Sequence, residues 1–166
     1  MNQDITSNTK LLRVVATGSA ALFSLIATIL AFSTDFGGWW EGYSWNYYYW
    51  IGSETAPGWS IIFIVLLALL FLGILIYSIL LIIVSLGKIT LPFNCKIQAI
   101  IGIVLATGGF ILTALMVGIM AIIAAGYDWW LETSFYSSLV GSIIIGIFYV
   151  FYFLLASRED SSSPAK

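Results

Sequence analysis

Hydrophobic positions along this chain gather into four long runs, separated by short segments rich in polar and turn-forming residues. Crossing about 30 Å of hydrocarbon takes about 20 helical residues, at about 1.5 Å for each residue. Every run meets that length. The pattern therefore predicts an all-α membrane protein, a bundle of four transmembrane helices over residues 11–34, 59–86, 97–125 and 135–156.

The segments between the runs complete the expected organisation, in which the whole chain forms a single tetraspan domain. With four crossings, loops 35–58 and 126–134 lie on one side of the membrane, and both termini lie on the other. Gly87 is expected to end the second helix, because glycine favours the position after a helix C-terminus, and Asn94 is expected to cap the third. The polar residues 157–166 are expected to be disordered.

The first outer loop contains an aromatic stretch: residues 35–50 hold four Trp and four Tyr. Residues 45–51 are rich in β-forming aromatic side chains and predict a strand, with Trp39–Tyr43 as its hairpin partner. Trp and Tyr are enriched where one part of the ring contacts hydrocarbon and another contacts water. We therefore expect a small aromatic β-hairpin or sheet in this loop, with a second aromatic cluster at 127–130 on the same side.

Small residues recur at helical spacing within the hydrophobic runs. In membranes, such residues let helix backbones approach closely and therefore mark packing faces. The third run carries two such stripes, which predicts contacts with two neighbouring helices. The expected helix-packing residues are Ala20, Ser24, Gly102, Ala106, Gly109, Gly118, Ser142 and Gly146.

Charge is scarce and divided between the two sides of the predicted bundle. The chain is 61% hydrophobic and 8% charged, whereas a soluble domain carries about 25% charged residues. The basic residues all fall on the side of the termini: Lys10, Arg13, Lys88, Lys96, Arg158 and Lys166. The other side carries acids alone: Asp35, Glu41, Glu54, Asp128 and Glu132. The positive-inside rule therefore predicts that both termini lie in the cytoplasm. The expected location is the plasma membrane.

The residue inventory excludes several classes of chemistry. The chain has no His and one cysteine, Cys95, so a Cys/His zinc site and Ser-His or Cys-His nucleophile pairs are impossible. No charged residue lies in the middle of a run, which argues against a transporter or redox pump. There is no basic tract for nucleic acid. We expect no catalytic residue and no cofactor.

Three features leave alternatives open. The outer acids lack the alternating spacing of a calcium loop, so a solvated acidic face is expected rather than a metal site. The aromatic cluster can stack on a glycan or enclose a small cationic ligand, or it can form the core of the outer loop. Cys95, beside Lys96 at a membrane boundary, is either S-palmitoylated or an unmodified thiol.

The layout resembles the claudin and peripheral-myelin-protein superfamily of tetraspan proteins. The resemblance covers nearly the whole chain in architecture, with Trp39 or Trp40 matching the family Trp after the first helix, and Trp45 or Trp50 matching the Trp of the first-loop strand. It implies rows of protomers in the membrane and contact with a facing cell. The chain departs from the family because its first loop lacks the paired cysteines, so aromatic packing must replace that disulfide.

Two functions follow from this pattern. The first is a non-enzymatic protein that self-associates or mediates adhesion or barrier contacts through an acidic, aromatic outer face. The alternative is an accessory subunit of a larger membrane complex, bound through the small-residue stripes. Partners are thus the lipid bilayer and either further copies or other membrane subunits. The expected interaction face comprises Trp39, Trp40, Glu41, Tyr43, Trp45, Tyr47, Tyr49, Trp50, Glu54, Trp129 and Trp130.

Overall fold

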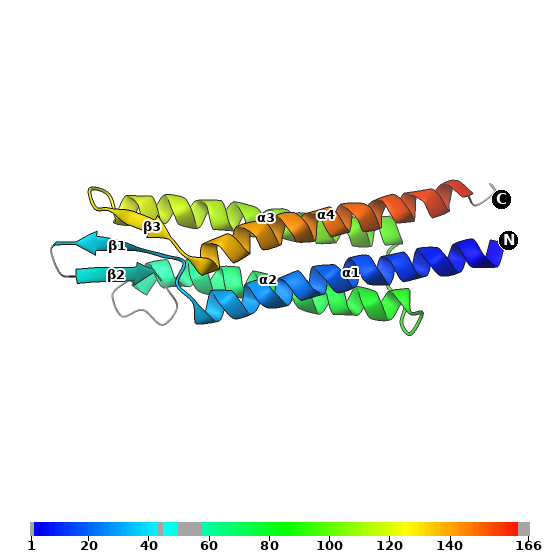
Figure 1. Ribbon diagram of the computed structural model, residues 1–166. Helices are drawn as coiled ribbons and strands as arrows, with labels where there is room; N and C mark the ends of the chain where they lie inside the picture. The colour runs from blue at the N-terminus through cyan, green and yellow to red at the C-terminus, as the bar shows by residue number, and fades with distance from the viewer. Residues whose placement is uncertain (1, 43–44, 50–57, 163–166) are drawn as a thin grey trace.

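The computed structural model describes residues 2–42, 45–49 and 58–162. Its four helices lie side by side, with the start of α1 and the end of α4 at one end of the bundle and a small sheet at the other (Figure 1). This arrangement confirms the predicted four-helix bundle. The helices are α1 (Asn2–Ser33), α2 (Gly58–Ser85), α3 (Cys95–Ile123) and α4 (Thr133–Ser162).

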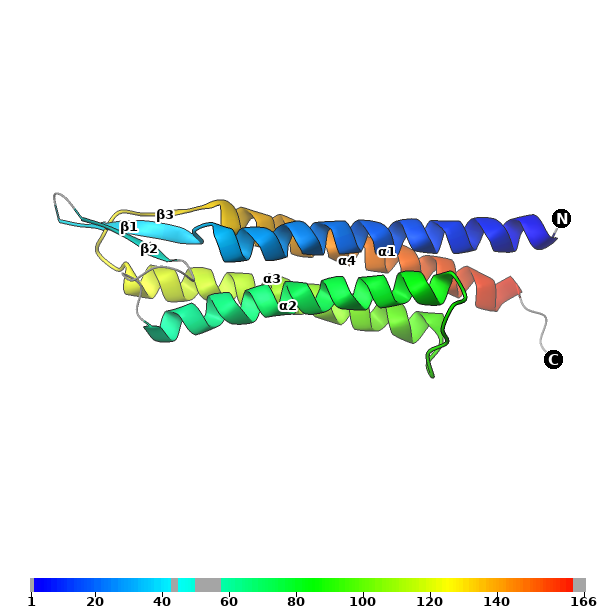
Figure 2. The same cartoon turned by 90° about the horizontal axis from the view of Figure 1, so that it is seen from below.

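The helices are arranged as a ring, in which α1 packs against α2 and α4, and α3 packs closely against α4 and more loosely against α2 (Figure 2). The core between them consists of fully buried apolar and aromatic side chains. Because lipid tails are as apolar as these side chains, close van der Waals packing holds such a bundle together. The largest core members include Phe71, Ile74, Met116, Met120, Ile145 and Tyr149.

The surface of the bundle is apolar. All four helices contain a stretch long and apolar enough to cross a membrane. Large hydrophobic side chains project outward along each of them, such as Leu22, Ile76, Val104 and Ile147. In water such a surface is unfavourable, whereas in a bilayer it contacts lipid. The stretches are Asn8–Ser33, Ile61–Ser85, Cys95–Ile123 and Thr133–Arg158.

A three-stranded antiparallel sheet forms the head of the molecule, in the order β2-β1-β3. The strands are β1 (Gly37–Glu41), β2 (Trp45–Tyr49) and β3 (Trp129–Leu131). The predicted hairpin is confirmed, because β1 pairs with β2 from Gly37–Tyr49 to Glu41–Trp45. The third strand was not predicted. It lies in the second outer loop, and three residues are too few to show a strand pattern in a sequence.

Two predicted helix ends are confirmed in the connection between α2 and α3. Gly87 adopts a φ of 74°, and the N–H groups of Gly87 and Lys88 donate to the carbonyls of Val84 and Ile83. Such left-handed geometry strongly favours glycine. The Asn94 side chain accepts a hydrogen bond of 2.9 Å from the backbone N–H of Ile97. The end of α2 and the start of α3 are therefore both fixed by capping hydrogen bonds, on either side of a short connection.

The structure corrects the expected ends of the first and last helices. The helix α4 continues through Ser162, so residues 157–162 of the tail expected to be disordered are helical. The helix α1 begins at Asn2, well before the hydrophobic run that starts at Leu11. Once a membrane-spanning helix has formed, each further residue adds a backbone hydrogen bond without a new nucleation cost. Hydrophobicity therefore marks the span but not the end of the helix.

Candidate functional site

The head sheet divides its aromatic side chains between an inner and an outer face. Adjacent residues of a strand point to opposite faces. Trp39 is 3% exposed and belongs to the core, whereas its neighbour Trp40 is 44% exposed. Tyr127, two residues before β3, and Trp129, the first residue of β3, are also about two-fifths exposed, at 40% and 39%. These three exposed rings, Trp40, Tyr127 and Trp129, are called the aromatic rim below.

Contacts between the head and the bundle fix the position of this rim. Phe36, fully buried before β1, packs edge-on against Phe135 of α4, with ring centroids 5.7 Å apart. Its carbonyl accepts a 2.9 Å hydrogen bond from the Glu132 N–H. Gly37 lies so close to Met120 and to the Trp130 carbonyl that an added Cβ would lie 2.5 Å from each. The sheet therefore packs closely against the ends of α3 and α4.

The acids of the head occupy two different environments. Glu41 is exposed, and its Oε1 accepts a 3.1 Å hydrogen bond from the Tyr127 hydroxyl. Asp35 lies deeper, at the junction of α1 and the sheet. Burial raises the pKa of the Asp35 carboxyl above its ordinary value of 3.8, and repulsion from the Glu132 carboxylate raises it further. At neutral pH, the negative charge of Asp35 at this junction is therefore unfavourable for the folded state.

Replacing Asp35 by Asn is expected to raise the melting temperature of the detergent-purified protein at pH 7. A carboxyl whose pKa is raised by folding destabilises the fold above that pKa, and protonation removes the penalty as the pH falls through it. The gain should therefore shrink on acidification toward the ordinary value of 3.8. Melting curves of both proteins across this range provide the measurement. A gain of equal size at neutral and acidic pH would contradict the electrostatic cause.

The structure places only part of the predicted interaction face. Trp40, Glu41 and Trp129 are exposed, Trp130 is half-buried and Trp39 is buried inside the head. Burial removes Trp39 from any contact surface, because its ring serves the core. The predicted residues Tyr43, Trp50 and Glu54 lie outside the described residues. For Trp45, Tyr47 and Tyr49, the structure describes the β2 backbone, in register with β1.

Most of the predicted helix-packing residues meet at the seam between α3 and α4. Gly102 lies against the ring of Tyr149, and Gly109 lies against the Ser142 hydroxyl. An added Cβ on Gly146 would lie 3.8 Å from that of Ala106. On α1, Ala20 and Ser24 are fully buried. These small side chains therefore lie where helix backbones come together.

Gly118 belongs to the second stripe of α3 and differs from the others. No atom lies within 4 Å of the position that its Cβ would occupy. Within the described chain, Gly118 is exposed and lies against no other helix, so a packing role for it stays a prediction about a partner. A shallow apolar groove of about 440 Å³ lies along this stripe, lined by Phe110, Ile111, Ala114, Leu115, Gly118, Ile119 and Ile122.

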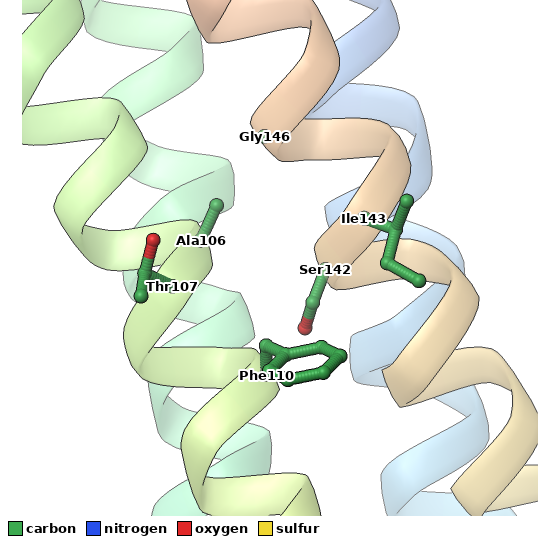
Figure 3. A pocket seen from close by; sticks show the side chains of 6 residues that line it. All are labelled: Ala106, Thr107, Phe110, Ser142, Ile143 and Gly146. Carbon is green, nitrogen blue, oxygen red and sulfur yellow. The ribbon is translucent and has the colours of Figure 1, made fainter.

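A second hollow of about 250 Å³ opens between α3 and α4, next to the groove. Figure 3 shows Phe110 of α3 and Ser142 of α4 facing each other across this opening. Both hydroxyl groups in its lining donate along their own helices: Thr107 to the Ile103 carbonyl and Ser142 to the Ser138 carbonyl. The hollow therefore presents an apolar surface that continues from the groove.

A polar cluster at the end of the bundle opposite the head was not predicted. The Arg13 side chain of α1 is 8% exposed, donates to the Cys95 Sγ at 3.1 Å and lies 5.6 Å from the centre of the Tyr152 ring. The Tyr152 hydroxyl in turn donates to Gln98 Oε1 at 3.0 Å. These contacts join α1, α3 and α4. The Cys95 thiol, at the first residue of α3, accepts the hydrogen bond from Arg13.

Further hydrogen bonds extend this polar cluster to α2. The Tyr77 hydroxyl donates to the Gln98 carbonyl at 2.7 Å, and the hydroxyls of Ser78 and Tyr149 lie 2.7 Å apart. In a low-dielectric interior, satisfied polar networks fix one arrangement of the core. Tyr77 and Ser78, both on α2, thus make hydrogen bonds to other helices. The geometry indicates a structural role for this cluster, because each of its hydroxyls takes part in a hydrogen bond. These hydroxyls belong to Tyr77, Ser78, Tyr149 and Tyr152.

The residues that the structure describes provide no group of three Asp, Glu, Cys or His side chains placed to hold a metal ion. No protein-family model matches the chain, and no curated protein or solved structure matches it either. What the fold defines is a class: the chain is a four-span integral membrane protein with a small aromatic sheet on one end of its bundle.

Proposed function

We propose that this chain is a non-enzymatic, claudin-like membrane protein that works by contact. Its aromatic rim mediates self-association or adhesion on the outer side of the plasma membrane, and both termini lie in the cytoplasm. The observation that carries the proposal is the rim itself, in which three large rings stand about two-fifths exposed on a sheet that is wedged onto the bundle. Exposed aromatic side chains on a rigid support are enriched at protein interfaces.

Single cysteines test both orientation and contact. In a Cys95→Ser background, Thr133→Cys places a thiol near the head and Lys88→Cys places one in the α2–α3 connection; both positions are exposed. On intact cells, a membrane-impermeant reagent should label the first and reach the second only after permeabilisation. The reverse result would overturn the orientation inferred from the basic residues.

The same thiol near the head reports on contacts. An impermeant thiol–thiol cross-linker joins two copies of the chain. A thiol–amine cross-linker captures only other proteins on this side, because the expected outer loops contain no Lys. Adding Trp40→Ser should remove most of either product, whereas Tyr136→Ser, at an exposed aromatic outside the sheet, should not. Unchanged yields with Trp40→Ser would show that the rim is not the contact surface.

The outward stripe of α3 supports a second function, that of an accessory subunit of a larger membrane complex. A small-residue groove exposed to lipid is suited to a helix of another protein. The double variant Ala114→Leu, Gly118→Leu fills this groove without touching the core. In mild detergent, a foreign subunit that copurifies stoichiometrically with the native chain should be lost from this variant. Retention of such a subunit, or copurification of further copies alone, would contradict this function.

A further inference from the structure

A pocket lies at the tip of the head, between the turn after β1 and the segment that leads into β3. It measures about 280 Å³ and is lined by Trp40, Gly42, Gly126, Tyr127 and Asp128. The two glycines adopt φ values of 76° and 90°, in the left-handed region that favours glycine. They contribute no side chain, so two aromatic rings and one carboxylate determine the chemistry of this tip pocket.

The sheet register explains how these groups come together. The pairing of Trp39 with Trp129 continues outward, because the Trp40 N–H donates to the Asp128 carbonyl at 2.9 Å. Trp40 and Asp128 are therefore opposite each other, and side chains of opposed residues lie on the same face of a sheet. That face points outward, since the adjacent Trp39 is buried.

Tyr127 supplies the second ring that lines the pocket. Its hydroxyl donates to Glu41 Oε1 at 3.1 Å. This hydrogen bond holds the Tyr127 side chain at the pocket and keeps the Glu41 carboxylate beside it. The tip pocket thus combines an indole, a phenol ring and the Asp128 carboxylate on a backbone fixed by strand pairing.

This combination is suited to a positively charged planar group. Aromatic faces attract cations within about 6 Å of the ring centre, with Trp the most favourable ring. A guanidinium stacks on such a face and donates paired hydrogen bonds to a carboxylate, which an ammonium does less well. We propose that the tip pocket binds the guanidinium group of an arginine on a partner protein, stacked on Trp40 and paired with Asp128.

The charge distribution of the chain identifies the partner as a different protein. Every basic residue of the sequence lies outside the two outer loops. Of those that the structure describes, Arg13 and Lys96 lie where α1 and α3 meet at the end of the bundle opposite the head. From Arg13 to the end of α1, about 20 helical residues span about 30 Å. A second copy in either membrane therefore presents acids, and not an arginine, to this pocket.

The proposal rests on the outer face being a contact surface, and its test is independent of cross-linking. The protein is labelled with 5-fluorotryptophan in nanodiscs, and the Trp40 fluorine resonance is assigned with Trp40→Phe. N-acetylarginine amide is the probe, because its blocked ends imitate a residue within a chain. N-acetylcitrulline amide has nearly the same shape without the charge. We expect a saturable shift of Trp40 with the arginine probe and none with citrulline.

Variants determine whether the tip pocket is responsible for the shift of the Trp40 resonance. Asp128→Asn should weaken binding of the arginine probe by about tenfold, as expected for the loss of a charge-assisted hydrogen bond. Asp35→Asn removes a head acid that does not line the pocket and should leave binding unchanged. Added salt should also weaken binding, since the groups are exposed.

Several results would overturn the proposal. These are equal shifts with citrulline, equal shifts at Trp129, full binding by Asp128→Asn, and a response to tetramethylammonium without one to the arginine probe. The last result would identify a small organic cation as the ligand. If Trp40→Ser abolishes cross-linking while the arginine probe leaves Trp40 unshifted, the rim is a contact surface but its partner does not insert an arginine.

Discussion

Trp39→Ala is expected to lower the free energy of unfolding by about 3–5 kcal/mol, the usual cost of removing a large buried aromatic side chain. Trp39 is 3% exposed and belongs to the same core cluster as Met116 and Met120 of α3. Its ring therefore joins the sheet to the bundle. The chain has no cysteine in this loop, so no disulfide can hold the head in place once the ring is lost.

The adjacent residue provides the control. Trp40→Ala removes the same side chain from the opposite face of β1, where the ring is 44% exposed. We expect its effect on stability to stay within about 0.5 kcal/mol, as for surface substitutions elsewhere. Unfolding of the purified variants in mixed micelles, followed by far-ultraviolet circular dichroism, measures both. Equal losses from the two substitutions would show that the head does not divide its Trp residues between core and surface.

The contrast between Trp39 and Trp40 also shows how far the sequence could predict this molecule. Four hydrophobic runs define the bundle, and the aromatic stretch between Gly37 and Tyr49 defines the hairpin, because both patterns depend on local composition. The sequence placed both Trp residues on one interaction face. Which ring faces the core depends on the register of β1 with β3, and that short strand has no recognisable sequence pattern.

Helix faces show the same limitation. The two small-residue stripes of α3 look equivalent in the sequence, yet Gly102 and Gly109 lie against α4 while Gly118 has open space beside it. Glycine and alanine are compatible with a packed interface and with lipid, so composition cannot distinguish the two. The contact of Arg13 with Cys95 joins residues 82 positions apart. Local periodicity carries no information about such a pair.

Gly102→Ala is expected to be the most damaging single-methyl addition in the helices. The added Cβ would overlap the ring of Tyr149, which is 1% exposed and cannot move into open space. Overpacking of this kind costs about 1–3 kcal/mol. A displaced Tyr149 ring would also lose its 2.7 Å hydrogen bond to Ser78, and a buried hydroxyl without a partner costs about 1–3 kcal/mol more.

Gly118→Ala, on the same helix, is the matched control. No atom lies within 4 Å of its Cβ position, so the substitution should be neutral, or stabilising by up to about 1 kcal/mol through the better helix propensity of alanine. In detergent, Gly102→Ala should therefore melt at a lower temperature than Gly118→Ala. Equal melting temperatures would mean that α3 presents a different face to α4.

A double-mutant cycle with Tyr149→Phe separates the two parts of the Gly102→Ala cost. Tyr149→Phe alone removes the hydroxyl that pairs with Ser78 but keeps the ring against Gly102. If Gly102→Ala acts partly by breaking this hydrogen bond, its cost should be smaller in the Tyr149→Phe background than in the native one. If the two costs add, the loss at Gly102 comes from overlap with the ring alone, and the hydrogen bond to Ser78 survives the substitution.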